Sequence, residues 1–346
     1  MKKLLAITLA LAMALALAAC GSASSDSSAP AASGSASSGG SAAPASTGSA
    51  ATDTVAVGAV VIARDDANTD DIYGFVSTIF ENTAAIAEQH GKGAELDLAF
   101  ASSVASVPYH PGAAKYFAEK GITVASVKEG AGTGASAALT FGTGGDTGTY
   151  YGFGSVLANY VTNANSFTVT AVTSGGSKAN IEDLDANDVQ LGFVQSDVMS
   201  YAYNGERLFD TPITGFSVVA ALYMEQVQIV TTNSAISSVD DLKGKTVSIG
   251  AVGSGVYFNA VDVLNAYGLS EADIKPVYQS FGDSADSLKD GKIDAAFIVA
   301  GAPTTAITDL AASGSVYLVS IDKAHADALI AANPFYSAYT IPAGTY

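Results

Sequence analysis

The alternation of two residue patterns from Ala137 onward constrains the fold more than any other feature of the sequence. Short runs rich in β-branched residues alternate there with amphipathic stretches, which is typical of a sheet with helices packed on its faces. The predicted strands cover 138–141, 167–173, 189–195, 218–222, 226–231, 246–250, 295–300 and 316–320. The sequence therefore predicts an α/β fold.

Helical periodicity fills the gaps between these strands and one long stretch upstream. Residues 150–161 and 256–267 each place apolar side chains three and four positions apart, and Gly268 follows the second stretch as its expected C-cap. Residues 69–90 carry a similar apolar stripe, and Thr69 is the expected N-cap. We expect a helix in each of these stretches.

A weak internal repeat indicates two lobes. Residues 188–194 (Asp-Val-Gln-Leu-Gly-Phe-Val) resemble residues 292–298 (Lys-Ile-Asp-Ala-Ala-Phe-Ile), and each segment leads into a turn of small or polar residues. Residues 53–346 make 294 residues, which at about 150 residues per domain also corresponds to two lobes. We expect two βα lobes that face each other.

The first 52 residues have a different composition. Two lysines precede an apolar run and then Leu-Ala-Ala-Cys at 17–20, which predicts a signal peptide over 1–19 and lipidation of Cys20. The alternative is a chance cysteine in an ordinary secretory signal. Residues 21–52 are almost entirely Ser, Ala, Gly, Pro and Thr, so we expect a flexible tether. These features predict an extracytoplasmic protein, lipid-anchored to the outer face of the bacterial cell membrane or periplasmic.

The charge balance excludes nucleic acid as a partner. The chain has 15 Lys+Arg against 33 Asp+Glu, a net charge of −18, whereas nucleic-acid binding requires a basic surface. Loss of Lys2 and Lys3 with the signal peptide leaves 13 basic residues against 33 acidic ones, a net charge of −20. The acidic excess belongs to the exported part.

Five predicted strands end in turns of small residues that lead into a helix. The turns are 142–145, 174–177, 195–197, 250–255 and 300–303. Glycine lets the backbone approach a ligand closely, and a helix N-terminus presents unpaired N–H groups that attract anions. The alternative, that small residues only close a tight turn, holds for any single turn, but five such turns favour a ligand cleft.

Motifs for catalysis, cofactors and metals are not recognisable. Residues 142–148 lack the third glycine of the dinucleotide motif, because Thr147 occupies its place. His90, His110 and His325 do not have metal-ligand spacing, and the acidic residues of 65–71 do not have the spacing of a calcium loop. We expect no enzymatic activity, no cofactor and no metal.

Several segments carry a family pattern. They are Phe-Gly-Thr-Gly-Gly-Asp-Thr-Gly-Thr-Tyr-Tyr at 141–151, Thr-Ser-Gly-Gly-Ser at 173–177, Val-Gln-Ser-Asp at 194–197, Asp-Leu-Lys-Gly-Lys at 241–245, Gly-Ala-Val-Gly-Ser-Gly at 250–255, Pro-Phe-Tyr at 334–336 and Ile-Pro-Ala-Gly-Thr-Tyr at 341–346. Together they resemble the TAXI family, the solute-binding subunits of one class of TRAP transporters. The likeness covers 137–346 in family order. Gly152 and Met224 depart from it, since the family often has proline there.

The order of the segments is the larger departure. In the TAXI family the chain continues beyond the segment at 341–346 into a strand, a long helix and a Pro-Gly-Ala-Ala-x-Tyr helix. Here 55–64, 70–90 and 110–116 resemble these parts and come first. The sequence therefore resembles a circular permutant in which residues 128–136 join the old chain ends. The alternative is a truncated domain preceded by a separate module at 52–127.

The resemblance implies a two-lobed, type II periplasmic-binding-protein-like fold with a central cleft and a hinge. It places 53–127 and 137–225 in the first lobe and 226–346 in the second, with a hinge crossing near 223–230. It implies capture of a small carboxylate, glutamate-like or another organic acid, and delivery to a TRAP permease. The alternative is a sensor subunit that presents the solute to a membrane receptor.

The turns and the resemblance together give the candidate binding residues. In the first lobe they are Thr143, Gly144, Gly145, Tyr150, Tyr151, Ser174, Gly175, Ser177, Gln195 and Ser196. In the second lobe they are Ser254, Gly255, Gly301 and Pro303. Tyr150 and Tyr151 could equally be core side chains on the helix face.

Overall fold

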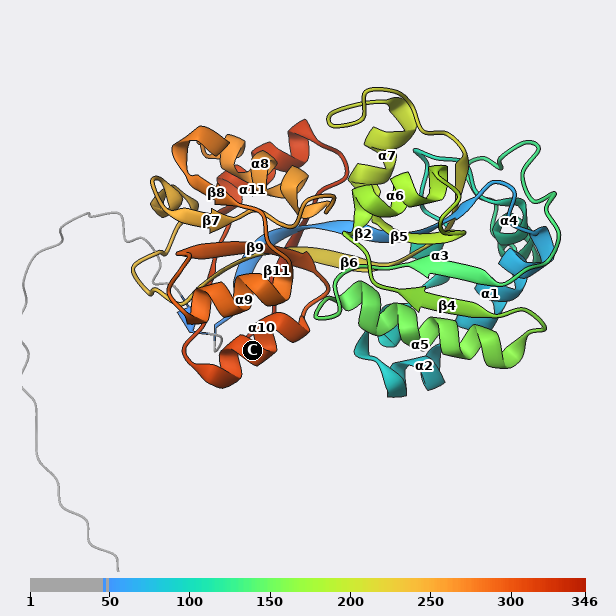
Figure 1. Cartoon of the computed structure of the whole chain (residues 1–346), viewed down its shortest axis with the longest axis horizontal. Coiled ribbons are helices and arrows are strands. Elements are labelled where there is room, and N and C mark those ends of the chain that lie inside the picture. Colours follow the sequence, from blue (N-terminus) through green and yellow to red (C-terminus); the bar gives the residue numbers. More distant parts are fainter. Residues whose placement is uncertain (1–45, 48–49) are drawn as a thin grey trace, which may run out of the picture. The chain divides into compact units, whose positions relative to one another are not determined.

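The structure is a computed structural model that describes residues 46–47 and 50–346. The predicted signal peptide, Cys20 and most of the predicted tether lie outside these residues. Residues 50–346 form two α/β lobes that share a continuous sheet, with strand order β4-β3-β5-β2-β6-β9-β7-β8 (Figure 1). The predicted two-lobed α/β fold is therefore confirmed.

Lobe 1 is built on three parallel strands. They are β3 (Leu139–Gly142), β4 (Val169–Val172) and β5 (Leu191–Gln195). The helices of lobe 1 are α1 (Thr69–Glu81), α2 (Thr83–Gln89), α3 (Leu98–Ala101), α4 (Pro111–Glu119), α5 (Thr149–Ala164), α6 (Ser177–Asp185) and α7 (Ser196–Asn204), with a 3₁₀ turn η1 (Gly91–Glu95). Each strand leads into a helix, as the residue pattern predicts.

Lobe 2 repeats this arrangement. Its parallel strands are β7 (Thr246–Ser248), β8 (Lys275–Val277) and β9 (Ala295–Ala300). Its helices are α8 (Val256–Ala266), α9 (Phe281–Lys289), α10 (Thr305–Ser313) and α11 (Lys323–Ala332), with 3₁₀ turns η2 (Val239–Leu242) and η3 (Glu271–Asp273). Antiparallel strands β10 (Tyr317–Val319), β11 (Ser337–Ile341) and the two-residue β1 (Ser46–Thr47) complete it.

Two long antiparallel strands, β2 (Thr52–Arg64) and β6 (Phe216–Thr231), connect the lobes. Val55 and Val57 belong to the core of lobe 2, whereas residues 59–63 belong to the core of lobe 1. The prediction of separate strands at 218–222 and 226–231 is wrong, because neither glycine nor proline interrupts the run and residues 223–226 pair with β2.

The two ends of the described body lie side by side in lobe 2. Strand β11 pairs antiparallel with the beginning of β2, so that Ile341 lies opposite Thr52 and Ser337 lies opposite Ala56. A short connection from residue 346 to residue 50 would turn these two strands into an ordinary β-hairpin.

The predicted helix at 69–90 differs from the structure at two points. Its N-cap is Asn68 rather than Thr69, because Asn68 Oδ1 accepts from the N–H groups of Asp70 and Asp71 at 2.8 and 3.2 Å. The helix is also divided at Asn82, whose side-chain amide donates to the carbonyl of Thr78 at 2.8 Å. An asparagine that bonds to nearby backbone competes with helix continuation.

Residues 128–136 lie against the beginning of α1. Lys128 Nζ is 3.3 Å from Asp65, and the Thr69 N–H donates to the carbonyl of Gly132 at 3.2 Å. The side chain of Asn68 donates to the carbonyl of Gly134 at 2.8 Å. The residues predicted to join the old chain ends are therefore fixed by specific contacts.

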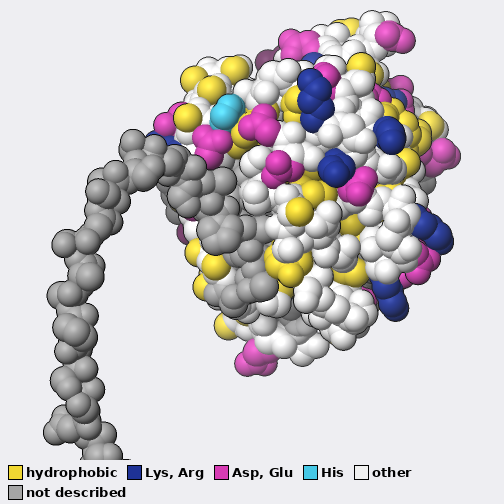
Figure 2. All heavy atoms as spheres, turned by 90° about the vertical axis from the view of Figure 1, so that its left-hand side faces the viewer, with side chains coloured by type: hydrophobic (Ala, Val, Ile, Leu, Met, Phe, Trp, Pro, Cys, Tyr) yellow, Lys and Arg dark blue, Asp and Glu magenta, His cyan; other side chains and the backbone are white. Residues whose placement is uncertain are grey.

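One face of lobe 2 is mixed in charge. On the face of lobe 2 seen in Figure 2, acidic, basic and apolar side chains are interspersed rather than gathered into one patch. Among residues 46–47 and 50–346, no helix is long and apolar enough to cross a membrane.

Candidate functional site

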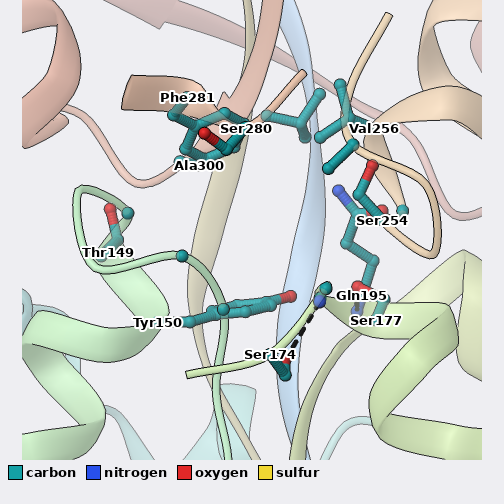
Figure 3. Close-up of a pocket in the computed structure, with 18 of the residues that line it drawn as sticks. Thr149, Tyr150, Ser174, Ser177, Gln195, Ser254, Val256, Ser280, Phe281 and Ala300 are labelled. Atoms are coloured by element: carbon teal, nitrogen blue, oxygen red, sulfur yellow. Dashed lines mark hydrogen bonds between the residues drawn. The ribbon is translucent and has the colours of Figure 1, made fainter. Parts of the chain in front are cut away.

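A cavity of about 80 Å³ lies between the lobes, next to β6 and β9. Tyr150, Ser177 and Gln195 reach it from lobe 1, and Ser254, Ser280 and Phe281 reach it from lobe 2 (Figure 3). The predicted residues that line it are Gly144, Gly145, Tyr150, Ser174, Gly175, Ser177, Gln195, Ser254 and Gly255. Because Ala300 also lines it, the fold brings residues of all five predicted turns to one cavity.

The other five predicted residues lie nearby but do not line the cavity. The Thr143 hydroxyl donates to the carbonyl of Val172 at 2.6 Å, and the Ser196 hydroxyl accepts from the N–H of Gly58 at 3.1 Å. Tyr151 is half-buried and lies outside the cavity lining. Gly301 and Pro303 follow β9, beyond the lining residue Ala300.

The main chemical property of the cavity is that five helices begin at its lining. The lining includes their N-cap residues, Gly148 of α5, Gly176 of α6, Gln195 of α7, Gly255 of α8 and Ser280 of α9. The N-cap residues of α5, α6 and α8 are glycines, which have no side chain to cap the helix. Within the described residues, the N-cap side chain of α7 makes no capping hydrogen bond either. The first N–H groups of these helices attract an anion, apart from that of Ala179 in α6, which donates to the carbonyl of Gly253 at 3.0 Å.

A buried carboxyl group, that of Glu225, lines the same cavity as these helix N-termini. Glu225 is 2% exposed, and Tyr150 Oη donates to its Oε2 at 2.7 Å. Burial raises the pKa of Glu225 to about 8. Glu225 is not among the predicted residues. It is the single charged residue of β6, and its place in an otherwise uncharged strand is the signal that could have revealed it.

Lys92 is the cationic side chain whose charge acts on Glu225, but it forms its ion pair with Glu95. Lys92 is buried, its Nζ is 2.5 Å from Glu95 Oε1, and it lies over the ring of Tyr223. Its charge lowers the pKa of Glu225, but less than burial raises it. Lys92 does not line the cavity, so a ligand would meet Glu225 without a competing ammonium group between them.

Two further polar atoms of the cavity have unused hydrogen-bonding capacity. Gln195 Oε1 and Ser254 Oγ are buried, and neither has a hydrogen-bond partner among the described residues. A Cβ atom on Gly255 would lie 1.8 Å from Gln195 Oε1, so glycine is required there for Gln195 to extend from lobe 1 toward Ser254 (Figure 3). Buried polar atoms left unpaired are costly, and a ligand could satisfy these two.

The lobes contact each other around the cavity. Thr149 Oγ1 donates to the carbonyl of Gly301 at 2.9 Å, and the N–H of Ala306 donates to the carbonyl of Thr147 at 3.2 Å. On another side, the N–H of Ala179 donates to the carbonyl of Gly253 at 3.0 Å. The structure is therefore a form in which the lobes are closed.

The histidines serve local structure. His90 Nδ1 accepts from the N–H of Lys92, and His110 Nδ1 accepts from the N–H of Gly112, each at 3.2 Å. His325 stacks on Tyr267 in lobe 2. Within the described part of the chain, no group of three or more His, Cys, Asp or Glu side chains could hold a metal ion.

Two solved structures with partial likeness to this chain illustrate the comparison. The alkanesulfonate-binding protein SsuA from Xanthomonas axonopodis pv. citri, bound to MOPS, is 22% identical over 54% of this chain, with a TM-score of 0.38. An ancestral arginine-binding protein bound to arginine is 16% identical over 58% of this chain and 91% of its own, with a TM-score of 0.37. The chain spans about 61% of the length of the sulfonate-binding protein.

The sequence itself gives the assignment. The model of the NMT1-like family matches residues 41–121 and 141–346, which is most of the chain. The matched residues include β2, β6 and every other strand apart from the first part of β3, together with the turns that form the cavity. The chain belongs to the NMT1-like family, a family of periplasmic solute-binding proteins.

Proposed function

We propose that this protein is an extracytoplasmic lipoprotein that captures a small carboxylate solute and delivers it to a TRAP-type permease. The observation that carries the proposal is the interlobe cavity at which five helices begin. A carboxylate can be bound there by N–H groups and hydroxyls without a cationic side chain. Family membership supports solute binding rather than catalysis.

The local nature of this attraction matters because the whole chain is acidic. With a net charge of −18, the overall field opposes an anionic ligand. The N-termini of α5, α6, α7 and α8 act only within about one helical turn, which places the favourable interactions inside the cavity. A small ligand with a localised negative charge fits these conditions.

The buried Glu225 narrows the ligand to one that also carries a positive group. Glu225 holds a proton in the ligand-free cavity, since burial raises its pKa to about 8. An ammonium group next to it would favour release of that proton and pair with the carboxylate, and Gln195 Oε1 and Ser254 Oγ could accept further hydrogen bonds. We therefore favour an amino acid, as the glutamate-like ligand of the sequence analysis would be, over an organic acid that lacks an amine.

A matched thermal-shift screen tests the ligand class. Glutamate and 2-oxoglutarate differ at the amine, and so do other amino acids and their oxo acids. A ligand that binds only the folded protein raises its unfolding temperature. We expect shifts from amino acids and none from their oxo acids at equal concentration. Binding of oxo acids alone would contradict a role for Glu225 in amine recognition.

Two variants separate the cavity from the rest of the molecule. Glu225→Gln removes the charge at the amine site and should weaken amino-acid binding at least about 10-fold, since a charged hydrogen bond contributes on the order of 1.5–3 kcal/mol. Glu88→Gln, on the exposed surface of α2, is the matched control and should bind as the wild type does. Equal affinity in both variants would exclude Glu225 from the site.

Anchoring and delivery have their own tests. Cys20→Ser should move the protein from the membrane fraction to the soluble fraction if Cys20 carries lipid. Uptake by vesicles that contain a TRAP permease should require the binding protein if it serves transport. Ligand-dependent signalling without uptake would instead support the sensor alternative.

We also propose that the chain is a circular permutant of its family. The two matched segments are separated by residues 122–140, which include the predicted junction at 128–136. Strands β11 and β2 are antiparallel neighbours, with Ile341 opposite Thr52, as two strands joined by a short loop would be. Permutation is tolerated where chain ends lie close together at the surface.

A further inference from the structure

We propose that a proton held between Asp197 of lobe 1 and Asn259 of lobe 2 latches the two lobes together in the closed form. Asp197 is in the first turn of α7, and Asn259 is on α8. Neither residue lines the ligand cavity. The latch therefore acts on closure itself and requires no ligand.

The pair contains two buried oxygen atoms without a hydrogen-bond partner among the described residues, which one added proton could join. Asn259 Nδ2 donates to Asp197 Oδ2 at 3.0 Å, and both residues are fully buried. The other oxygen of each group, Asp197 Oδ1 and Asn259 Oδ1, has no hydrogen-bond partner among the described residues. A carboxylic acid that faces a carboxamide can donate one hydrogen bond and accept another. A proton on Asp197 directed to Asn259 Oδ1 would satisfy both unpaired oxygens.

Burial is the largest influence on Asp197 and favours this proton, and the carboxyl of Asp262 on α8 favours it further because it repels a negative charge at Asp197. The backbone N–H of Val198 and the amide of Asn259 lower the pKa of Asp197, but less than burial raises it. Glu225 on β6 also lies near, and it is protonated up to a pH of about 8. Arg207 is the nearby cation, but its Nη2 is bound to Asp262 Oδ1 at 2.7 Å. An ionised Asp197 would therefore be a buried charge without a cation bound to it.

Two tyrosines complete the surroundings, and one of them, Tyr336, is hydrogen-bonded to Asn259. Tyr336 Oη accepts from Asn259 Nδ2 at 2.7 Å and donates to Asp262 Oδ2 at 3.1 Å. Tyr201, on α7, packs against Phe258 of lobe 2 with ring centroids 5.7 Å apart. Burial raises the pKa values of both tyrosines, so both phenols stay neutral at physiological pH. Of Asp197 and the two tyrosines, Asp197 is then the group that can change charge.

The sign of the pH effect follows from exposure. Burial raises the pKa of Asp197 to about 7 in the closed form, whereas parting of the lobes would expose it to water and return its pKa toward 3.8. The closed form then binds one more proton than the open form between these values. The closing equilibrium constant should fall by up to about 10-fold per pH unit across this range and level off above pH 7.

Interlobe distance in the ligand-free, full-length chain tests the latch. Cys20→Ser removes the one native cysteine, and cysteines introduced at the exposed positions Asn159 on α5 and Asp286 on α9 carry spin labels. We expect the short-distance population to fall from pH 5 to pH 7 and then to stay constant. A wild-type distribution that does not change with pH would overturn the proposal.

Three variants identify the titrating group. Asp197→Asn keeps a neutral pair with Asn259, so it should retain the short distance and lose the pH response. Asn259→Leu should lose the short distance at pH 5; if this variant does not fold, the comparison of Asp197→Asn with the wild type decides. Glu88→Gln, on the exposed surface of α2, is the matched control and should keep the response. A response that persists in Asp197→Asn would overturn the latch without affecting the proposed ligand.

Discussion

At the scale of single residues, buried carboxyl groups distinguish this protein. Glu225 and Asp197 are both almost fully buried, and neither forms an ion pair with a cationic side chain within the described residues. Burial of an unpaired charge is costly, so such groups take up a proton. Their cost to folding depends on pH, which provides a measurement that needs no ligand.

The stability of the ligand-free protein should fall as pH rises. Burial raises the pKa of Glu225 from 4.5 to about 8, so the folded state binds more protons than the unfolded state between these values. Its favourable contribution is complete below pH 4.5 and is lost as pH rises through 8, at up to about 1.4 kcal/mol per pH unit. Thermal unfolding from pH 5 to pH 8 should show this fall, and Glu225→Gln should reduce it.

Glu88→Gln again supplies the control, because Glu88 is exposed on α2. Its unfolding temperature should follow the wild type across the same pH range. Identical slopes for Glu225→Gln and the wild type would mean that Glu225 is already ionised in the folded protein.

At the scale of elements, the sequence predicts best where the residue pattern alone determines the structure. The strand at 295–300 is found as predicted, and α5 and α8 fall within one or two residues of their predicted starts. Strands β8 and β11 have no such pattern, since β8 is three residues long and contains a proline, and β11 is largely exposed. Tertiary pairing determines these strands.

The junction at 128–136 allows an element-scale prediction. A Cβ atom on Gly134 would lie 2.0 Å from the carbonyl oxygen of Asp66, so Gly134→Ala must displace backbone next to the start of α1. We expect a loss of about 1–3 kcal/mol in the free energy of unfolding, measured by chemical denaturation. Gly215→Ala is the matched control, because no atom lies within 4 Å of the Cβ position at Gly215. An unchanged free energy of unfolding in Gly134→Ala would show that the backbone of the junction can shift without a loss of stability.

At the scale of the whole molecule, the candidate site could be predicted in part because of topology. Parallel strands of one lobe end at the same edge, so the turns after β3, β4 and β5 meet there. Ser280 and Phe281 were not predicted, because they follow β8, which the residue pattern does not reveal. Glu225 was not predicted because the candidate residues were taken from turns of small residues that lead into a helix, whereas Glu225 lies in the middle of β6.

A rejoined chain tests the circular order. A chain that begins at Ala137, connects Tyr346 to Ala50 and ends at Val127 should fold with one cooperative unfolding transition, because β11 and β2 are already neighbours. The fragment 137–346 should show no cooperative transition, because it lacks β2, which pairs with β5, β6 and β11. A stable fragment 137–346 that binds ligand would contradict the permutation and support a separate module at 52–127.

The ladder between β2 and β6 has a further mechanical consequence. Its register shifts twice, between Ala59 and Val60 and between Val61 and Ile62, which leaves Leu222 and Val219 of β6 without an opposite residue. Over this ladder β6 is longer than β2 by two residues, about 6–7 Å of path. A ribbon with edges of unequal length must curve. The difference in residue number between β6 and β2 thus contributes to the angle between the lobes. Deletion of Leu222 should change this angle without altering any residue of the cavity.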